Sequence, residues 1–274
     1  MIPNKKKDQH IMIIPEINKK VIEIAEITKN DNVLEIGGGP GNLTELIMKK
    51  AKFVYTVEKD EEYCSELKKR FLAQKNVEII CEDILNVKLP IFNKIVANPP
   101  YQILQQFFIR LLIKNRENFE CCVMIIPNKF TKIITRLPEE NNFGLLSALF
   151  YVFYNVEIIS TVPKESFSPM PKVTSYLVKI TMKKSEDSGI KLLKKIFLQY
   201  NKKIGNIMLS FLWNNMYDNK YLTKKEAKIR IEKLRQKDTI KKIFEKNILR
   251  LSDNETRELI LLILTDDEFC KNIS

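Results

Sequence analysis

Short apolar runs alternate with longer amphipathic segments over the first two-thirds of the chain. The runs predict strands, and the segments with helical spacing predict helices. The predicted strands cover residues 33–36, 53–57, 77–80, 94–97 and 121–126, and the predicted helices cover residues 42–50, 60–72, 102–114 and 128–137. This alternation is typical of an α/β fold, a parallel sheet with helices on both faces. Residues 156–161 and 173–180 predict two further strands, antiparallel to each other, around a proline-rich loop.

The pattern changes after residue 182. Residues 182–189 are polar and lack periodicity, so we place a linker there. Only helical patterns follow, over residues 192–200, 204–213, 224–236, 240–246 and 254–264. The sequence therefore predicts two domains: an α/β domain over residues 1–182 and a small all-helical domain over residues 183–274.

The formal net charge of +12 is concentrated in the second predicted domain. Residues 1–182 carry 25 basic and 21 acidic side chains, whereas residues 183–274 carry 21 basic and 13 acidic ones. A basic segment suits a polyanion such as RNA, because each neutralised phosphate releases counterions. A solvated helical surface in a lysine-rich chain explains the same charge about equally well.

The apolar runs and the cysteine and histidine content limit the class of protein. The chain has no stretch of 18 uncharged apolar residues and no apolar leader behind its basic start, so we expect neither a membrane span nor secretion. Its five cysteines have no Cys-x-x-Cys spacing and it has a single histidine, so we expect no metal site. We therefore predict buried, reduced thiols in a cytoplasmic protein.

Four of the seven glycines fall in the segment Glu35-Ile36-Gly37-Gly38-Gly39-Pro40-Gly41, between a predicted strand and a predicted helix. Glycines this concentrated indicate a backbone that turns sharply and lets a ligand approach closely at the carboxyl edge of the sheet. A dinucleotide fingerprint would need a glycine where Asn42 stands, and a phosphate-binding loop would need a lysine after Gly41. NAD binding is thus the second interpretation.

The Glu-x-Gly-x-Gly-x-Gly spacing resembles the first motif of the class I methyltransferases, which bind S-adenosylmethionine over this turn. The resemblance implies a Rossmann-like, mostly parallel seven-stranded sheet. It also makes Glu35, Gly37, Gly39 and Gly41 expected contacts of the cofactor.

Two carboxylates at the ends of the following strands support this interpretation. Glu58 ends the second predicted strand, where a carboxylate can accept hydrogen bonds from both ribose hydroxyls. Asp83 follows the third predicted strand and can accept from the adenine amine of the cofactor. Either residue alone is more often a surface carboxylate. In register with the glycines, we expect both to contact the cofactor.

The tetrapeptide Asn98-Pro99-Pro100-Tyr101 follows the fourth predicted strand. Two prolines alone indicate a stiff turn, but the full set resembles the Asn/Asp-Pro-Pro-Tyr motif of methyltransferases that act on amines conjugated to a planar system. Such an amine is a poor nucleophile. The side-chain oxygen of Asn98 and the carbonyl of Pro99 can accept both amine hydrogens and aim the nitrogen lone pair at the methyl group. Tyr101 can stack on the base, and Asn98 is also an expected cofactor contact.

This tetrapeptide occurs in enzymes that act on adenine in DNA, on adenine in RNA and on glutamine in protein. Another part of the sequence must therefore indicate which of these substrates is methylated. The segment Phe167-Ser168-Pro169-Met170-Pro171-Lys172-Val173-Thr174-Ser175 is similar to the late Phe-x-Pro-x-Pro-Lys-Val-x-Ser motif of the ribosomal RNA adenine dimethyltransferases. By this resemblance Phe167 stacks on the flipped adenine opposite Tyr101, and Lys172 contacts RNA. A lone phenylalanine is more often a core residue.

Shorter segments agree with the same family. Residues 5–10 look like its amino-terminal segment, which closes over the cofactor, so Gln9 and His10 are expected contacts; a frayed basic tail is the alternative. Residues 199–203 resemble the start of its basic carboxyl domain, which implies RNA contacts by Lys202 and Lys203. The chain departs from the family at Pro99, where leucine or isoleucine is usual.

The favoured interpretation is an enzyme that uses S-adenosylmethionine to dimethylate the exocyclic amines of two adjacent adenines near the 3′ end of small-subunit ribosomal RNA. Its partner is this RNA within the small subunit or its precursor, and we expect a monomer. One alternative is methylation of adenine in large-subunit RNA or in DNA. Another is a catalytically idle, RNA-binding assembly factor. The retained Asn98, Tyr101, Glu58 and cofactor glycines favour an active enzyme.

Overall fold

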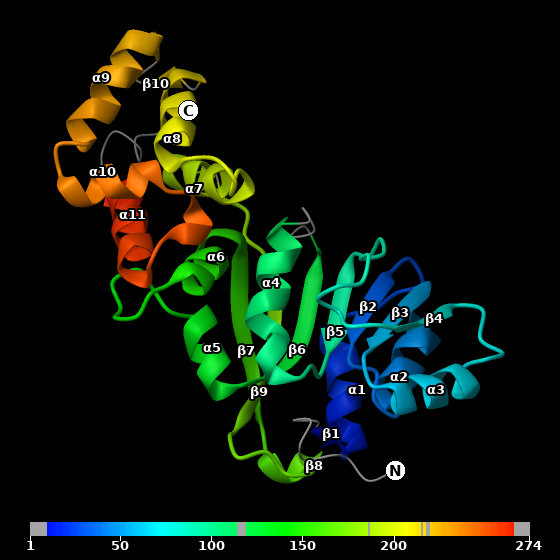
Figure 1. Ribbon diagram of the computed structural model, residues 1–274. Coiled ribbons are helices and arrows are strands. Elements are labelled where there is room, and N and C mark those ends of the chain that lie inside the picture. Colours follow the sequence, from blue (N-terminus) through cyan, green and yellow to red (C-terminus); the bar gives the residue numbers. More distant parts are fainter. Residues whose placement is uncertain (1–9, 114–118, 186, 215, 218–219, 266–274) are drawn as a thin grey trace. The chain divides into compact units, whose positions relative to one another are not determined.

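The computed structural model describes residues 10–113, 119–185, 187–214, 216–217 and 220–265 (Figure 1). It divides into two compact units: residues 1–132 with 155–182, and residues 133–154 with 183–274. One passage between the units falls at residue 182, where the sequence placed the linker. Residues 133–154, which the sequence assigned to the first domain, instead belong with the helical unit. Their helix is apolar almost all round and packs against helices of that unit.

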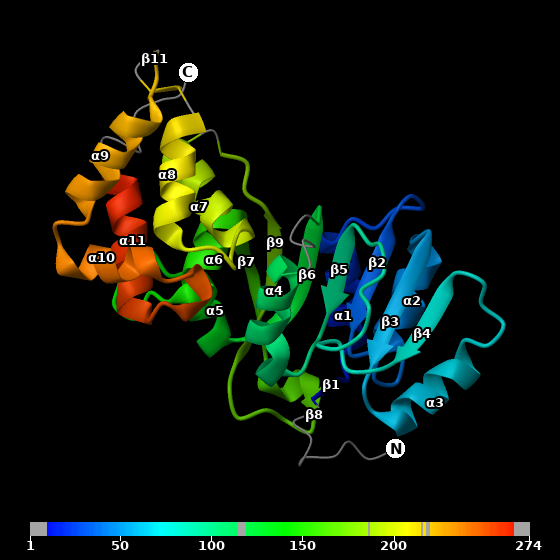
Figure 2. The same ribbon diagram turned by 45° about the horizontal axis from the view of Figure 1, so that its top comes forward.

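The first unit is built on a seven-stranded sheet with the spatial order β4-β3-β2-β5-β6-β9-β7 (Figures 1 and 2). Its strands are β2 (Asn32–Ile36), β3 (Phe53–Glu58), β4 (Val77–Cys81), β5 (Lys94–Ala97), β6 (Cys121–Pro127), β7 (Tyr154–Val162) and β9 (Ser175–Met182). The first five strands pair in parallel, and β9 runs antiparallel to β6. This architecture confirms the expected Rossmann-like fold with its mostly parallel sheet.

Four helices lie where the spacing predicted them: α2 (Asn42–Lys50), α3 (Glu61–Arg70), α4 (Leu104–Ile113) and α5 (Asn128–Ile134). A further helix before the large sheet, α1 (Pro15–Ile24), was not predicted. Helices α1 and α2 pack on alternate residues of the central strands, among them Val33, Val54 and Val96. Such alternation is the expected consequence of the two-residue period of a strand. The packing holds α1 and α2 together on one face of the sheet.

A two-stranded antiparallel ribbon joins the start of the described chain to the late motif. Strand β1 (Ile11–Met12) pairs with β8 (Phe167–Ser168), and Met12 stands opposite Phe167. Both side chains are buried in the same core as α1 and α2. The peptide bond between Ser168 and Pro169 is cis. The ribbon brings segments about 150 residues apart in sequence to one place.

The second unit is helical, apart from a short hairpin of β10 (Met216–Tyr217) and β11 (Lys220–Tyr221). Its helices are α6 (Leu145–Phe153), α7 (Ser188–Leu198), α8 (Ile204–Asn214), α9 (Lys224–Leu234), α10 (Asp238–Glu245) and α11 (Asp253–Thr265). Helix α9 begins with a reciprocal capping box between Thr223 and Glu226. Within the described part of the chain, no helix is both long and apolar enough to cross a bilayer.

Candidate active site

A cleft that is partly open to solvent lies at the carboxyl ends of β2, β3 and β5. Strand β2 pairs with β3 on one side and with β5 on the other, so the chain reverses its direction across the sheet here. Open α/β sheets bind ligands at such switch points. The cleft is lined by residues 10–12, Asn18, residues 37–40, Asn42, Leu43, Glu58, Tyr63 and residues 98–101.

The glycine turn adopts the backbone conformation that its composition predicted. Gly37, Gly39 and Gly41 have φ angles of +77°, +51° and +86°, in the left-handed region that other residues rarely adopt. A Cβ atom on Gly39 would lie 3.2 Å from Cδ1 of Ile11. Gly37 and Gly39 therefore keep the floor of the cleft free of side-chain atoms at the point where β2 passes into α2. Gly41, also an expected cofactor contact, lies outside the described lining, and a Cβ atom there would lie 2.9 Å from side-chain atoms of Leu67 and Phe71.

The Glu58 carboxylate is held by the backbone around it. Its Oε2 accepts a hydrogen bond from the Gly39 amide at 2.9 Å, and its Oε1 accepts from the Asp60 amide at 2.8 Å. Each carboxylate oxygen can accept more than one hydrogen bond. Glu58 lines the cleft, so its remaining acceptor capacity fits the two hydroxyls of a ribose.

The Asn98 amide is oriented by the start of the described chain. Its Nδ2 donates to the backbone oxygen of His10 at 3.1 Å, which leaves Oδ1 as an acceptor at the cleft. The His10 ring is itself fixed, because its Nδ1 lies 2.8 Å from the backbone oxygen of Pro169. Pro169 of the late motif therefore fixes His10, and His10 in turn orients the Asn98 amide.

Tyr101 is tied to the other end of the late motif. Its hydroxyl lies 2.6 Å from Oγ of Ser175, a fully buried residue of β9. The His10 and Tyr101 ring centroids are 6.2 Å apart, with 31° between the ring planes. The tetrapeptide over residues 98–101 thus contacts Ser175 directly and is linked to Pro169 through His10.

A family model described as ribosomal RNA adenine dimethylase matches residues 3–248 of the chain. The chain belongs to the ribosomal RNA adenine dimethylase family. Members of this family are S-adenosylmethionine-dependent methyltransferases that act on ribosomal RNA. The family assignment confirms the cofactor and the class of enzyme that the motifs indicated, and the cleft fits this cofactor through its glycine floor and the available acceptors of Glu58.

Individual relatives of this dimethylase agree. The chain is 38% identical over 202 residues to a probable ribosomal RNA small subunit methyltransferase A of Pyrococcus abyssi, and the match covers 74% of each chain. A protein with the same description from Methanococcus maripaludis is 38% identical over 220 residues, which are 76% of this chain and 80% of that one. The crystal structure of a dimethyladenosine transferase from Plasmodium falciparum is 28% identical, with a TM-score of 0.61, and covers 95% of this chain and 99% of that one.

Glu35 of the dimethylase does not line the cleft, contrary to its expected cofactor contact. The side chain is fully buried, and its Oε2 accepts hydrogen bonds from Oγ1 of Thr44 at 2.6 Å and of Thr56 at 2.7 Å. Burial raises the pKa of Glu35 to about 8. Within the described structure, Oε1 has no hydrogen-bond partner. Glu35 therefore joins β2, α2 and β3 beneath the glycine turn.

Phe167 also differs from the prediction. Its side chain is 3% exposed and packs in the core under α1 and α2, opposite Met12. It is absent from the described lining of the cleft, so the ring has no open face for an adenine. The core alternative holds, because pairing of β8 with β1 turns this side chain inward.

Asp83 lies outside the described cleft lining and is engaged elsewhere. Its Oδ2 forms an ion pair with Nζ of Lys59 at 2.7 Å, and its Oδ1 accepts from the Leu85 amide at 2.9 Å. The Lys59 ammonium lowers the pKa of Asp83. To contact the cofactor adenine, the carboxylate oxygens of Asp83 would have to accept from the adenine amine as well as from Lys59.

The residues expected to contact RNA are exposed. Lys172, Lys202 and Lys203 all face solvent, and Lys203 forms an ion pair with Glu245 at 2.6 Å. Gln9, the remaining predicted cofactor contact, lies outside the described residues.

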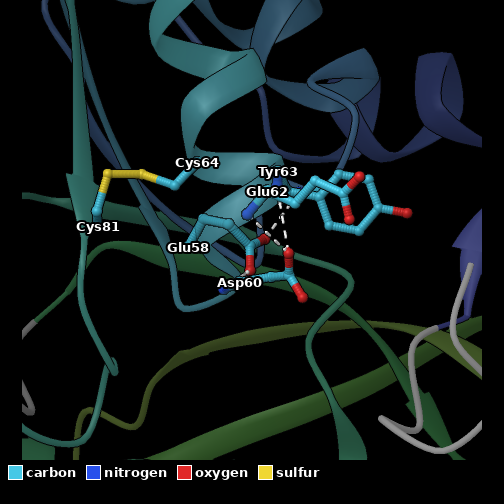
Figure 3. The surroundings of a disulfide bond; sticks show 7 residues. Glu58, Asp60, Glu62, Tyr63, Cys64 and Cys81 are labelled. Atoms are coloured by element: carbon cyan, nitrogen blue, oxygen red, sulfur yellow. Dashed lines mark hydrogen bonds between the residues drawn. A yellow bond between two sulfur atoms is a disulfide. The ribbon is translucent and has the colours of Figure 1, made fainter. Parts of the chain in front are cut away.

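The prediction of reduced thiols is wrong for one pair of cysteines. Cys64 on α3 and Cys81 at the end of β4 form a disulfide, with their Cα atoms 5.7 Å apart (Figure 3). They meet because α3 packs back against β4, which the 17-residue separation alone does not indicate. The bond lies on the helix that Asp60 caps, beside Glu58 (Figure 3). Cys121 and Cys122 are free and buried, and Cys270 lies outside the described residues.

Sequence motifs missed several residues of the cleft. Met12, Asn18, Asn42, Leu43 and Tyr63 all line it, yet none belongs to a motif that we assigned to the cofactor. A signal existed for Asn18, because an amide interrupts the apolar face of an amphipathic segment there.

Proposed function

We propose that this dimethylase transfers two methyl groups to the exocyclic amine of each of two adjacent adenines near the 3′ end of small-subunit ribosomal RNA. The observation that carries the proposal is the Asn98 amide, fixed by the His10 carbonyl so that its oxygen serves as an acceptor at a glycine-floored cleft. The small-subunit target is supported by the descriptions of the relatives from Pyrococcus abyssi and Methanococcus maripaludis.

The residues of the cleft supply positioning rather than strong acid–base chemistry. When bound, S-adenosylmethionine supplies an electrophilic methyl group on a sulfonium. In the first transfer, Oδ1 of Asn98 and the carbonyl of Pro99 would accept the two hydrogens of the target amine and hold the nitrogen lone pair toward that methyl group. In the second transfer the amine would offer one hydrogen to one of these acceptors. Each transfer would form an N–C bond, release S-adenosylhomocysteine and give one amine proton to solvent. Geometry of this kind needs no histidine base near the amine.

Tyr101 is the stacking surface for the target base in this proposal. The hydrogen bond to Ser175 holds the ring at the cleft. A base that has left its stack in the RNA can then lie against this ring. Phe167 takes no part, because it is buried in the core. Asp83 contacts the cofactor adenine only when it shares its acceptors with Lys59.

Basic side chains supply the wider contact with RNA. We propose that Lys172 on the first unit and Lys202 and Lys203 on the helical unit bind backbone phosphates. All three are exposed, and phosphate binding by Lys203 competes with its ion pair to Glu245. We further propose that the protein acts as a monomer in the cytoplasm, where assembling small subunits supply its substrate.

The test offers tritiated S-adenosylmethionine with undermethylated 30S particles, 50S particles and DNA. The proposal expects incorporation into 30S RNA as dimethyladenine at two adjacent positions. Incorporation into 50S particles or DNA instead would overturn the target, and tight particle binding without incorporation would identify an idle assembly factor.

The variant Asn98→Ala should lower transfer by at least about 100-fold, the usual effect of removing one preorganised polar group. Cofactor binding should persist, as measured by calorimetry with S-adenosylhomocysteine. Asn76→Ala is the matched control, because the Asn76 amide also donates to a backbone oxygen, that of Met48, but lies outside the cleft lining. A near-wild-type rate for Asn98→Ala would refute the role of this amide.

A further inference from the structure

Helix α1 buries one polar residue within an apolar face. Asn18 is 6% exposed and lies among the buried Val21 and Ile22 and the partly buried Ile14 and Ile17. No residue in the described part of the structure forms a hydrogen bond with its side-chain amide. The amide atoms are not among the fully buried unpaired atoms and reach the cleft instead, so an amide within this apolar face suits a ligand or a water molecule there.

The position of Asn18 indicates which part of the cleft it serves. Asn18 lines the cleft together with Met12 and Asn42, and it also lines an adjoining groove with Asn42 and Glu45 of α2. That groove does not include Glu58 or Tyr63 in its described lining. Asn18 therefore lies at the α2 side of the cleft, away from the side where Glu58 is expected to bind the ribose.

The amino end of α2 adds a second feature at this side. Helix α2 begins at Asn42, and its cap residue Gly41 provides no side-chain hydrogen bond to the first amides. The first amides of a helix favour anions. A carboxylate at this point would meet the helix terminus and could also accept from the Asn18 amide.

We propose that the Asn18 side chain binds the amino-acid end of S-adenosylmethionine. Its Nδ2 donates to the carboxylate, and its Oδ1 accepts from the ammonium group. The proposal rests on the cofactor site of the proposed function and adds to it a residue outside the glycine motif. It explains why an amide occupies a position where the rest of the helix face is apolar.

The test compares two ligands that differ only at this end. S-adenosylhomocysteine carries the amino acid, whereas 5′-methylthioadenosine retains the adenosine and the thioether without it. For Asn18→Leu, calorimetry should show Kd for S-adenosylhomocysteine raised about tenfold and Kd for 5′-methylthioadenosine unchanged, the loss expected for one hydrogen-bonding partner of a charged group. Asn30→Leu, which changes an exposed amide outside the cleft, should alter neither affinity.

A structural role for Asn18 would give a different result. Without ligand, Asn18→Leu should unfold at the same or a higher temperature, because leucine suits the apolar face of α1. Asn18→Ala serves as the second variant if leucine prevents folding. The proposal would be overturned if Asn18→Leu raised the Kd of both ligands equally. It would also be overturned if the Kd for S-adenosylhomocysteine did not change, and the amide would then bind only water. If the wild-type protein binds neither ligand, the cofactor site itself fails.

Discussion

Replacing Glu35 by glutamine should change how the stability of the protein depends on pH. The carboxyl group is fully buried beneath the glycine turn, and burial raises its pKa from the ordinary value of 4.5 to about 8. Between these two values the unfolded chain has released the proton while the folded chain keeps it. The free energy of unfolding therefore falls as the pH rises through this window, and it becomes flat again above about pH 8.

The magnitude follows from the size of the pKa shift. Each pH unit in the window is worth about 1.4 kcal/mol, so the wild-type protein should lose about 4 kcal/mol between pH 5 and pH 8 from this group alone. Glu35→Gln cannot titrate and should lack the slope. At pH 5 the variant should be as stable as the wild type or less stable by up to about 2 kcal/mol, because its amide lacks partners. At pH 8 the variant should be more stable by about 2–4 kcal/mol, because only the wild-type protein loses stability over this range.

Other shifted groups titrate outside this window. The carboxylates with lowered pKa values, such as Asp31 and Asp83, contribute stability that is lost only as the pH falls below about 4.5. Among the described residues, the other raised pKa values belong to Lys179, to the buried thiols of Cys121 and Cys122, and to Tyr63 and Tyr151, and the ordinary values of all these groups are 9 or above. A pH slope between 5 and 8 that the wild-type protein shows and Glu35→Gln lacks can therefore be assigned to Glu35.

Urea unfolding at pH 5, 6.5 and 8 measures the effect. Glu45→Gln is the control, because Glu45 is a partly exposed carboxylate whose pKa is lowered by Lys49 and Arg70, so its contribution is constant over this range. Glu35→Gln should also bind S-adenosylhomocysteine normally, since Glu35 is outside the described cleft lining. If the stability difference between wild type and Glu35→Gln is the same at pH 5 and pH 8, Glu35 is ionised in the folded protein and the reasoning is wrong.

Two further predictions concern the disulfide and the basic surface. Reduction of the bond between Cys64 and Cys81 should lower the free energy of unfolding by up to about 3 kcal/mol, the usual contribution for a loop of this length, while Cys64→Ser should not respond to the reductant in thermal unfolding. If both thiols are alkylated without reduction, the bond is not formed. Reversing the charges of Lys202 and Lys203 to glutamate should weaken RNA binding and reduce its salt slope by about two ions. An unchanged slope would exclude the two lysines from the RNA contact.

The periodicity of the sequence predicted most of the α/β unit. Residues 42–50 form α2 as expected, and residues 94–97 form β5 as expected, because each apolar run is bounded by polar or turn residues. Helix α6 was missed because seven of its nine residues are buried, so it has no polar face to reveal a helical period. The strands β1 and β8 were missed because two residues carry no periodicity at all.

The motifs predicted where the site lies, but they did not predict the role of every residue in them. Gly37, Glu58, Asn98 and Tyr101 come together at one cleft, because parallel strands present their carboxyl ends at one edge. The motifs placed Phe167 at the same cleft, but the pairing of Phe167 with Met12 was not visible to them. The contact between Cys64 and Cys81 likewise depends on how α3 returns to the sheet.

The pairing of β1 with β8 has a consequence for synthesis of the protein on the ribosome. Strand β1 emerges first, but its partner, residues 167–168, is made only after six strands of the large sheet. The carbonyl that orients Asn98 belongs to His10, which is anchored to Pro169. Because domains generally fold as units during synthesis, truncated products that stop before residue 167 contain the whole glycine turn but lack the Pro169 contact that anchors His10 beside the Asn98 amide.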